Sequence, residues 1–468
     1  MAFPYRRSAE LPKIRLGGIK AVRKFLLLLI ILSLLCYVPL TAGIAEESSD
    51  DGVTYLYIEG NGTNAIDQQF EAEHPNVVIQ YVSSDTYEGM TIYEAIISHL
   101  VTIDVCYADN TSTAEAFLSK GYALDLSQFP SLKTMADAMY EPIRSFAYAN
   151  DSLVMLPYSI RLNYVMEYQE AALTEAGLTA DDIPQTFSGL LKMMIQWDQE
   201  YGNQPDVVPF LFDESSHREL LLYALNAYIS SYKKSGEELQ FDTEEFRTLL
   251  DQVQEAAQSS YVQTADYNPA RLFMQVGRTV PGIHTISFPL RENETPRFSG
   301  NVSGWMIYSG SQHAELAAEY IAYRMSLLSD AENILLYDGQ YEPVERDDFQ
   351  EQKESWEQSR SLLEQQLSEE TDEVTKRDLE YQIQQLTKYI ENPSDDLRYE
   401  ITAAEINFYQ QDIIPNMGIT YQNQITESSY TGAWAQTLIK QYVNGVIDRE
   451  AFIRELNQHV QMMRMEME

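Results

Sequence analysis

The residue types that most often carry out catalysis are present, but they lack the spacings that catalysis requires. No GxSxG, HExxH, GxGxxG or Walker motif occurs. The acidic residues number 71, so a carboxylate pair suited to glycoside hydrolysis carries no specificity, and none of them forms a calcium loop. The histidines show no metal-ligand spacing. They are His74, His99, His217, His284, His313 and His459. We therefore expect no catalytic residue, no metal and no cofactor, and predict that the protein is not an enzyme.

Aromatic side chains indicate binding instead. The chain contains 32 tyrosines, and Tyr and Trp rings can stack on the apolar face of a sugar while amides and carboxylates bond its hydroxyls. Most aromatic residues fill cores, so a binding role is expected only where a loop or strand crossing places the ring over a cleft. Tyr158, Trp305 and Tyr421 meet this condition. Trp197 and Trp434 lie within predicted helices and are expected to be core residues.

Alternating strands and helices must position these rings. Strands are predicted at 54–60, 76–82 and 103–109, and helices at 64–73, 93–100 and 114–118. This alternation predicts an α/β fold with a mostly parallel sheet and helices on its faces. Ligands of such sheets lie at the carboxyl ends of strands. The loops 60–64 and 109–113 are therefore candidate ligand loops.

The stretch Asp151–Tyr168 (DSLVMLPYSIRLNYVMEY) has strand composition on both sides of a Pro-Tyr-Ser step. A proline inside such a run argues against a central strand and for an edge, a bend or a crossing point. Similar alternations of strand and helix flank the stretch on both sides. We therefore predict a hinge strand between two α/β lobes, with the ligand cleft between them.

Further elements follow the hinge. Helices are predicted at 170–176, 187–197, 215–233, 243–257, 313–328, 400–412, 431–443 and 448–463, and strands at 207–213, 278–290 and 302–310. Residues 344–392 contain neither Gly nor Pro, are rich in charged residues and carry apolar residues at helical spacing. They predict a helical hairpin or short coiled coil that turns near 369–373. It is either a docking arm or a solvated insertion packed on itself.

The N-terminus indicates export. Seven basic residues in the first 24 precede an apolar run, 25–45, which ends in small residues. This order is typical of a secretory signal peptide, although 21 residues also suffice for an uncleaved membrane anchor. Cys36 lacks the small preceding residue of a lipoprotein signal, which leaves Cys106 as the single cysteine of the exported chain, expected to be buried. We expect an extracellular, cell-surface protein.

The formal net charge is −39, which disfavours nucleic acid, anionic membrane surfaces and polyanionic ligands.

The predicted organisation has eight parts. They are a signal peptide or anchor (1–45), an acidic tether (46–53), lobe 1 (54–150), the hinge strand (151–168), lobe 2 (169–290), a return to lobe 1 and the hinge (291–343), the helical hairpin (344–392) and C-terminal helices that complete both lobes (393–468).

Several segments together resemble the extracellular solute-binding proteins of ABC importers, and most closely the carbohydrate-binding, maltose-binding-type branch, family 1. They are FEAEHPNVVIQYV, KGYALDLSQF, LVMLPYSIRLNYVMEY, EAGLTADDIPQTFSGLL and NGVIDREAFIRELNQHVQMM. The resemblance covers nearly all of 54–343 and 395–464. Tyr168-Gln169-Glu170 departs from the family's Tyr-Asn-Lys step, and Thr186-Phe187 departs from Thr-Trp. The simplest members lack residues 344–392.

The resemblance implies a two-lobe periplasmic-binding-protein-like fold of type II and a solute, most simply a sugar, held between the lobes. It also implies ABC permease subunits as membrane partners. The ligand-facing positions it implies are Asn61, Asn64, Asp109, Asn110, Tyr158, Ser159, Gly304, Trp305 and Tyr421.

Other functions stay open. The same fold serves sensors that present a solute to a membrane receptor, with 344–392 as docking surface. An exported carbohydrate-active enzyme and a peptide or metal ligand are further alternatives, and metal is the weakest of these.

Overall fold

The computed structural model describes residues 52–62, 64–83, 92–98, 100–108, 111–149, 151–201, 217–235, 238–258, 272–275, 279–419 and 432–467. The chain divides into two units, Met1–Thr54 and Tyr55–Glu468, and the elements below belong to the second, apart from the first residue of β1. Within the described ranges, no helix has both the length and the apolar composition needed to cross a membrane. The predicted signal or anchor, and most of the tether, lie outside the described residues.

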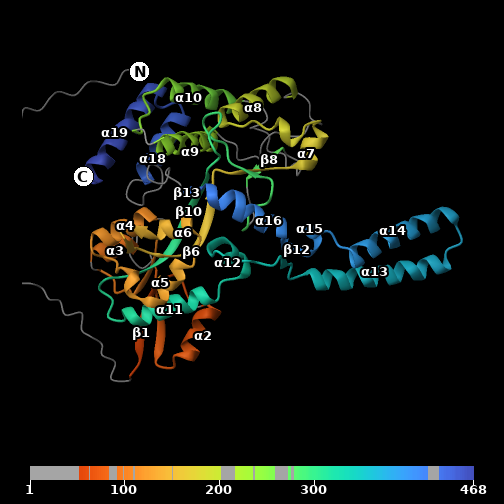
Figure 1. The fold of residues 1–468 in the computed structure, drawn as a ribbon, viewed down its shortest axis with the longest axis horizontal. Helices are drawn as coiled ribbons and strands as arrows, with labels where there is room; N and C mark the ends of the chain where they lie inside the picture. Colours follow the sequence, from red (N-terminus) through yellow and green to blue (C-terminus); the bar gives the residue numbers. More distant parts are fainter. Residues whose placement is uncertain are drawn as a thin grey trace, which may run out of the picture. The chain divides into compact units, whose positions relative to one another are not determined.

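The largest sheet has the strand order β2, β1, β3, β10, β13, with β6 paired to β10. Figure 1 labels β1, β6, β10 and β13 of this sheet. The strands of the sheet are β1 (Thr54–Glu59), β2 (Val77–Val82), β3 (Val105–Ala108), β6 (Leu156–Asn163), β10 (Phe298–Ile307) and β13 (Met417–Ile419). β1 and β3 are parallel, whereas β10 is antiparallel to both β3 and β6 and parallel to β13. The sheet is therefore mixed, because β10 enters it late in the chain and in the opposite direction.

Helices and short strands before and after β10 pack with this sheet into a first core, whose members include Leu56, Ile58, Phe70, Val105, Trp305 and Ile321. The helices are α2 (Ala65–Glu73), α3 (Ile92–Ile97), α4 (Thr111–Ser119), α5 (Pro130–Asp137), α6 (Glu141–Ala147), α11 (Ala314–Ser326) and α12 (Asp330–Leu336), and the strands β4 (Tyr148–Ala149) and β5 (Ser152–Leu153) pair with each other. Cys106 lies in this core, and burial raises the pKa of its thiol well above the ordinary value, so it is a packing residue.

A second core has no residue in common with the first in the part of the chain that the structure describes. Its members include Leu190, Leu221, Tyr228, Phe246, Leu438 and Phe452. It is built from α7 (Glu170–Glu175), α8 (Phe187–Tyr201), α9 (His217–Ser235), α10 (Glu244–Ala256), α18 (Gly432–Val443) and α19 (Arg449–Met467), with a small sheet of β8 (Phe273–Gln275), β7 (Met166–Tyr168) and β9 (Thr285–Ile286). Helix α10 shows why these helices form: Thr243 caps it and its apolar residues recur every three or four positions.

The chain passes from the first core to the second between β6 and β7. Leu156 at the start of β6 is buried in the first core, and Met166 at the start of β7 is buried in the second. β6 pairs only with β10 among the described strands, and is therefore an edge strand, one of the positions that the proline predicts. The pairing jumps from Ser303 opposite Ser159 to Gly304 opposite Pro157, so Tyr158 is the extra residue of a β-bulge.

The region 344–401 contains two long antiparallel helices, α13 (Phe349–Glu369) and α14 (Glu373–Glu391), which lie side by side (Figure 1). Asp372 caps α14 by accepting hydrogen bonds from the backbone of the next turn. At the base, β11 (Val344–Glu345) and β12 (Tyr399–Ile401) pair antiparallel, followed in sequence by α16 (Ala403–Phe408), with α15 (Asp395–Arg398) before β12.

Two sequence-based element predictions are wrong in detail. The strand predicted at 278–290 is reduced to β9, because Pro281 and Pro289 cannot donate to a ladder. The helix predicted at 400–412 starts later, at Ala403, after β12, and widens to a π-helical turn at Tyr409–Ile413 before the 3-10 turn Ile414–Asn416. The strand predicted at 207–213 lies outside the described residues.

Candidate functional site

Three aromatic rings meet where β3, β10 and β6 lie side by side. Trp305 of β10 is opposite Tyr107 of β3, and the bulge on β6 carries Tyr158. The ring centroid of Trp305 lies 4.5 Å from that of Tyr107 and 5.2 Å from that of Tyr158, and the ring centroids of the two tyrosines are 5.9 Å apart. The antiparallel register therefore brings together two residues that the sequence singles out, Tyr158 and Trp305, and one that it does not, Tyr107. We call these three residues the ring cluster.

Within the ring cluster, Trp305 is the buried member. Only 3% of its surface is exposed. Tyr320 of α11 packs edge-on against the indole at 6.2 Å, and the guanidinium of Arg324 lies 5.6 Å from its ring centre. In this structure the indole is a core residue, which differs from the ligand-stacking role that the resemblance implies for it.

The two tyrosines are only half-buried, so they are the ring-cluster members that can reach a ligand. Burial, together with the neighbouring Tyr158, raises the pKa of Tyr107 to about 12. The phenol of Tyr107 is therefore protonated at neutral pH and can donate a hydrogen bond. Ser159, the next residue of β6, is also half-buried.

Gly304, another predicted ligand position, is explained by packing. It is buried, and a Cβ at this position would lie 2.8 Å from the side chain of Met155 and 3.0 Å from the carbonyl oxygen of Leu156. Only glycine lets β10 approach this close to the chain entering β6.

A buried polar network behind the ring cluster fixes α2 to α11. The Asp67 side chain is 0% exposed. Its carboxylate accepts hydrogen bonds from Tyr320 Oη at 2.8 Å, from Arg324 Nη1 at 3.0 Å and from the Tyr81 hydroxyl. Because the buried charge is paired and fully bonded, the network holds Arg324 beneath Trp305.

The predicted ligand loops are only partly described. Asn61 is exposed just after β1. Asn64 caps α2, with its Oδ1 accepting from Asp67 N at 3.0 Å, so its amide oxygen is already engaged in the capping box. Asp109, Asn110 and Tyr421 lie outside the described residues.

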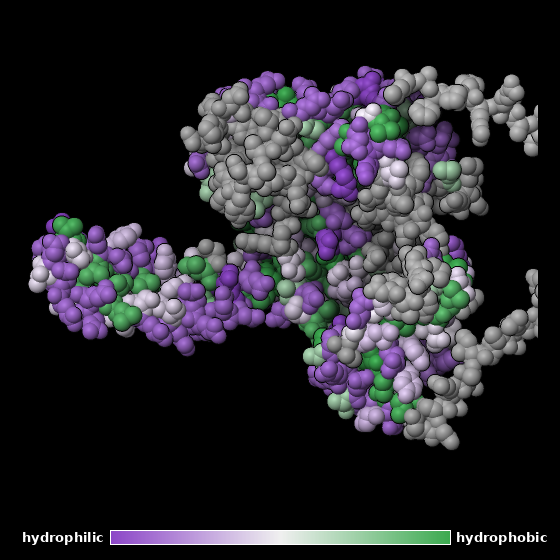
Figure 2. Space-filling model, turned by 180° about the vertical axis from the view of Figure 1, so that it is seen from behind, coloured by the Kyte–Doolittle hydropathy of each residue, from purple (hydrophilic) through white to green (hydrophobic). Residues whose placement is uncertain are grey.

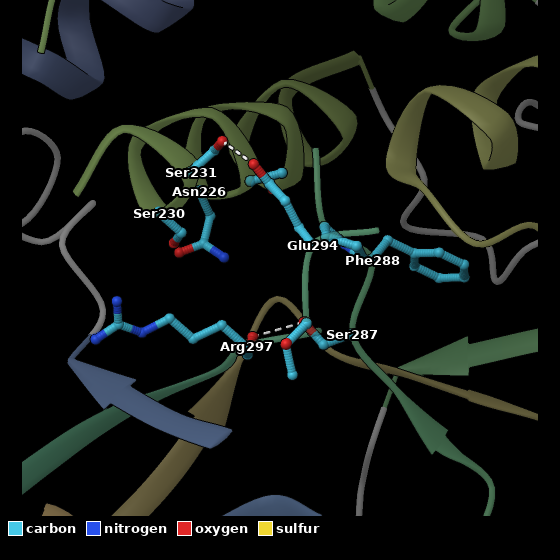
Figure 3. A pocket seen from close by; sticks show the side chains of 10 residues that line it. Asn226, Ser230, Ser231, Ser287, Phe288, Glu294 and Arg297 are labelled. Atoms are coloured by element: carbon cyan, nitrogen blue, oxygen red, sulfur yellow. Dashed lines mark hydrogen bonds between the residues drawn. The ribbon is translucent and has the colours of Figure 1, made fainter. Parts of the chain in front are cut away.

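A small polar cavity lies between α9 and the segment that enters β10 (Figure 3). Ser231 Oγ donates to Glu294 Oε1, and Ser287 Oγ donates to the Arg297 carbonyl, both at 2.6 Å. Its volume is about 20 Å³, which is room for about one water molecule. Pockets for small organic ligands have volumes of roughly 300–1,000 Å³. This cavity is therefore too small for a sugar.

Among the described residues, no three His, Cys, Asp or Glu side chains are grouped as metal ligands. What the ring cluster offers chemically is a pair of half-buried phenols beside strand ends. Such a surface can hold a solute by ring stacking and hydrogen bonds. The sequence contained one signal for the missed Tyr107: it follows Cys106 in the predicted strand IDVCYAD, and therefore points to the opposite face of the sheet.

Comparison with known proteins gives a family and a fold. The sequence profile described as "Bacterial extracellular solute-binding protein" matches residues 58–326. A structure from work on xylan utilization by Caldanaerobius polysaccharolyticus is similar with a TM-score of 0.52 and 16% identity, over 86% of this chain and 99% of that one. An ABC substrate-binding protein from Listeria monocytogenes, solved with cycloalternan, gives a TM-score of 0.50 and 13% identity over 88% and 98%. No curated protein matches the sequence. At these identities the structural likeness shows the fold alone.

Proposed function

Because the chain belongs to the bacterial extracellular solute-binding proteins, we propose that it is the solute-capture subunit of an ABC importer, with a sugar or oligosaccharide as its solute. Membership of this family makes it a binding protein and confirms the prediction that it is not an enzyme. The family is extracellular, in agreement with the predicted export of the chain.

The observation that carries this proposal is the ring cluster, which packs in the first core on strands that include β6, after which the chain passes to the second core. We propose that the cores belong to two lobes joined through β6 and β10, with the solute between them. Half-buried Tyr158 lies on β6, and half-buried Tyr107 lies on β3, which pairs with β10. Hinge closure of two lobes around a ligand is an established mode of switching.

A neutral, hydroxyl-rich solute agrees best with the chemistry. The net charge of −39 repels anions. Tyrosine rings stack on sugar faces, and their hydroxyls bond sugar hydroxyls. One of the two solved structures described above comes from work on xylan utilization, and the other is a complex with cycloalternan. Xylan and cycloalternan are both carbohydrates.

The proposed ligand-facing set keeps the positions that the resemblance implies, except Gly304 and Trp305, and adds Tyr107. Tyr158, Tyr107 and Ser159 are its half-buried members, and Asn61 and Asn64 are exposed. Asp109, Asn110 and Tyr421 remain in the set as predictions outside the described residues. Gly304 and Trp305 are buried, and they contribute to the site through packing and not through contact with the ligand. Closure needs contacts that the ligand makes only in the closed state, and the residues of the ligand-facing set would supply them.

The test is a thermal-shift screen of the exported chain against mono- and oligosaccharides, amino acids and short peptides. A bound sugar raises the melting temperature by mass action. Tyr158→Ala should weaken sugar binding by about 1–3 kcal/mol. Tyr201→Ala is the matched control, because Tyr201 is a half-buried tyrosine of α8 whose ring contacts that of Trp197 at 4.7 Å. A screen in which only peptides or amino acids raise the melting temperature contradicts the sugar assignment.

A solute sensor is the second candidate, and the hairpin α13–α14 favours it. Leu362 on α13 and Tyr381 on α14 are 61% and 63% exposed, and both line an uncharged groove between the helices. Figure 2 shows hydrophobic residues among hydrophilic ones along this hairpin, at the left of the view. Such exposed apolar residues are typical of a docking surface.

Excision of the hairpin separates the two candidates. The Arg346 amide donates to the Arg398 carbonyl at 3.0 Å, so β11 and β12 can be joined by a short turn without moving either strand. In a sensor, the excised chain keeps its sugar affinity and loses signalling. In an importer without a docking role for the hairpin, both affinity and uptake are retained.

The N-terminal segment would export the chain and either be removed or remain as a tether. The mass of the protein recovered from the cell surface decides this. Loss of about the first 45 residues indicates a signal peptide, and an intact N-terminus in the membrane fraction indicates an anchor.

A further inference from the structure

A hollow of about 550 Å³ lies where four helices of the second core begin or end. His217 of α9, Gln254 of α10 and Tyr442 of α18 line it, together with Asp448 and Arg449 at the start of α19. This volume lies within the range of small-molecule sites. None of these residues belongs to β3, β6 or β10, so the hollow is built from different elements than the ring cluster.

Two residues that line this hollow each have a buried side-chain polar atom without a hydrogen-bond partner in the described part of the chain. The two atoms are Tyr442 Oη and His217 Nε2. Tyr442 is 7% exposed, and its ring is held by a stacked contact with Phe452 at 4.5 Å. The His217 and Tyr442 rings meet edge-to-face at 5.8 Å. Buried polar atoms in folded proteins nearly always have a partner, so two in one hollow indicate a missing one.

The protonation of the two side chains defines what the partner must offer. The Val443 carbonyl accepts a hydrogen bond from the His217 ring, and since Nε2 has no partner, Nδ1 is the donor. Burial lowers the pKa of His217, so the ring is neutral and Nε2 is an acceptor. Burial raises the pKa of Tyr442, so its phenol stays protonated and can donate or accept.

The charged groups at the hollow are already engaged. Arg449 Nη1 bonds both carboxylate oxygens of Asp251, at 2.6 and 2.5 Å. Asp448 Oδ1 accepts from Ala451 N at 2.7 Å and caps α19. What remains unsatisfied is therefore a neutral acceptor and a neutral phenol, with the amide of Gln254 at the exposed rim.

We propose that this hollow is a second binding site, for a small neutral solute that carries hydroxyl groups. One hydroxyl donates to His217 Nε2, and the same or a neighbouring hydroxyl bonds to Tyr442 Oη. A hydroxyl can both donate and accept, which is the combination that these two atoms require. Since the hollow has room for far more than one water molecule, a polyol can enter it.

The experiment is an NMR titration of the full exported chain labelled with ¹⁵N-histidine. The probes are glycerol, erythritol and glucose, with ethanolamine and lactate as a cation and an anion of similar size. We expect a saturable shift of the His217 ring nitrogens with at least one neutral probe. We also expect Tyr442→Phe to weaken that binding about fivefold or more, through the loss of one hydrogen bond. Tyr158→Ala should leave the shift unchanged, which separates this site from the ring cluster.

Tyr442→Phe also makes a prediction without any probe. Because it removes an unpartnered buried hydroxyl and keeps the ring, it should leave the melting temperature unchanged or raise it. Tyr223→Phe is the matched control: Tyr223 is also 7% exposed, but its hydroxyl donates to the Val165 carbonyl at 3.1 Å, so this substitution should lower the melting temperature. If Tyr442→Phe lowers the melting temperature as Tyr223→Phe does and no neutral probe shifts His217, the hollow holds only water and the proposal fails. A shift with ethanolamine or lactate alone also overturns it.

Discussion

Replacing Trp305 by alanine distinguishes a core residue from a ligand platform. The indole is 3% exposed and is surrounded by Tyr107, Tyr158, Tyr320 and Arg324. Deleting a buried Trp side chain costs about 3–5 kcal/mol, through lost burial and the cavity left behind. We therefore expect Trp305→Ala to lower the free energy of unfolding by that amount, and to weaken sugar binding only by disturbing the tyrosines beside it.

The assay is urea unfolding followed by circular dichroism, because substitution of a Trp alters fluorescence directly. Trp356→Ala serves as a matched control: Trp356 is half-buried on α13, where its ring lies 5.6 Å from that of Tyr389. A smaller cost, about 1–2 kcal/mol, is expected there because less surface is buried. The reasoning is refuted if Trp305→Ala leaves the unfolding free energy within about 1 kcal/mol of wild type while sugar binding is lost. Trp305 would then be the ligand-stacking residue that the resemblance implies.

Three further predictions concern the packing and the charged groups of α2, β10 and α11. Arg324→Met should cost about 3–5 kcal/mol of stability, since it leaves the Asp67 carboxylate buried without its cation, and Asp67→Asn in the same chain should restore much of the loss in urea unfolding. Gly304→Ala should cost about 1–3 kcal/mol, because the added methyl overlaps a neighbouring methionine; a thermal midpoint equal to wild type would show that the strand has room. Burial opposes protonation of His74, but the Phe70 carbonyl and Glu319 outweigh it and raise its pKa above 6.5. Protonated His74 therefore stabilises the folded protein fully below pH 6.5, and this stabilisation is lost as the pH rises through the raised folded-state pKa. Glu319→Gln should accordingly flatten the fall in melting temperature above pH 6.5.

Local signals were sufficient for elements whose caps and periodicity agree. The sequence predicts a helix at 243–257, and α10 spans Glu244–Ala256, because Thr243 supplies the cap and the apolar spacing is regular. No helix or strand is predicted at 130–147, where α5 and α6 lie. Both helices carry a proline in their first turn, Pro130 and Pro142, which is itself a helix-start signal.

The candidate site shows where local patterns stop being informative. The sequence identifies Tyr158 and Trp305 from their strand context, and the structure places their rings 5.2 Å apart. It could not show that Trp305 is covered, because the covering residues Tyr320 and Arg324 come from α11, after β10 has entered the sheet. Nor could it show that Asn64 is committed to a helix cap, since a loop asparagine suits either role.

The most direct test of the central proposal is small-angle X-ray scattering of the exported chain, with and without the sugar that gives the largest thermal shift. If two lobes close on a neutral solute, the radius of gyration falls on saturation with sugar, and Tyr158→Ala needs more sugar to reach the same value. An unchanged radius of gyration at saturating sugar would contradict closure, and with it the proposed capture mechanism.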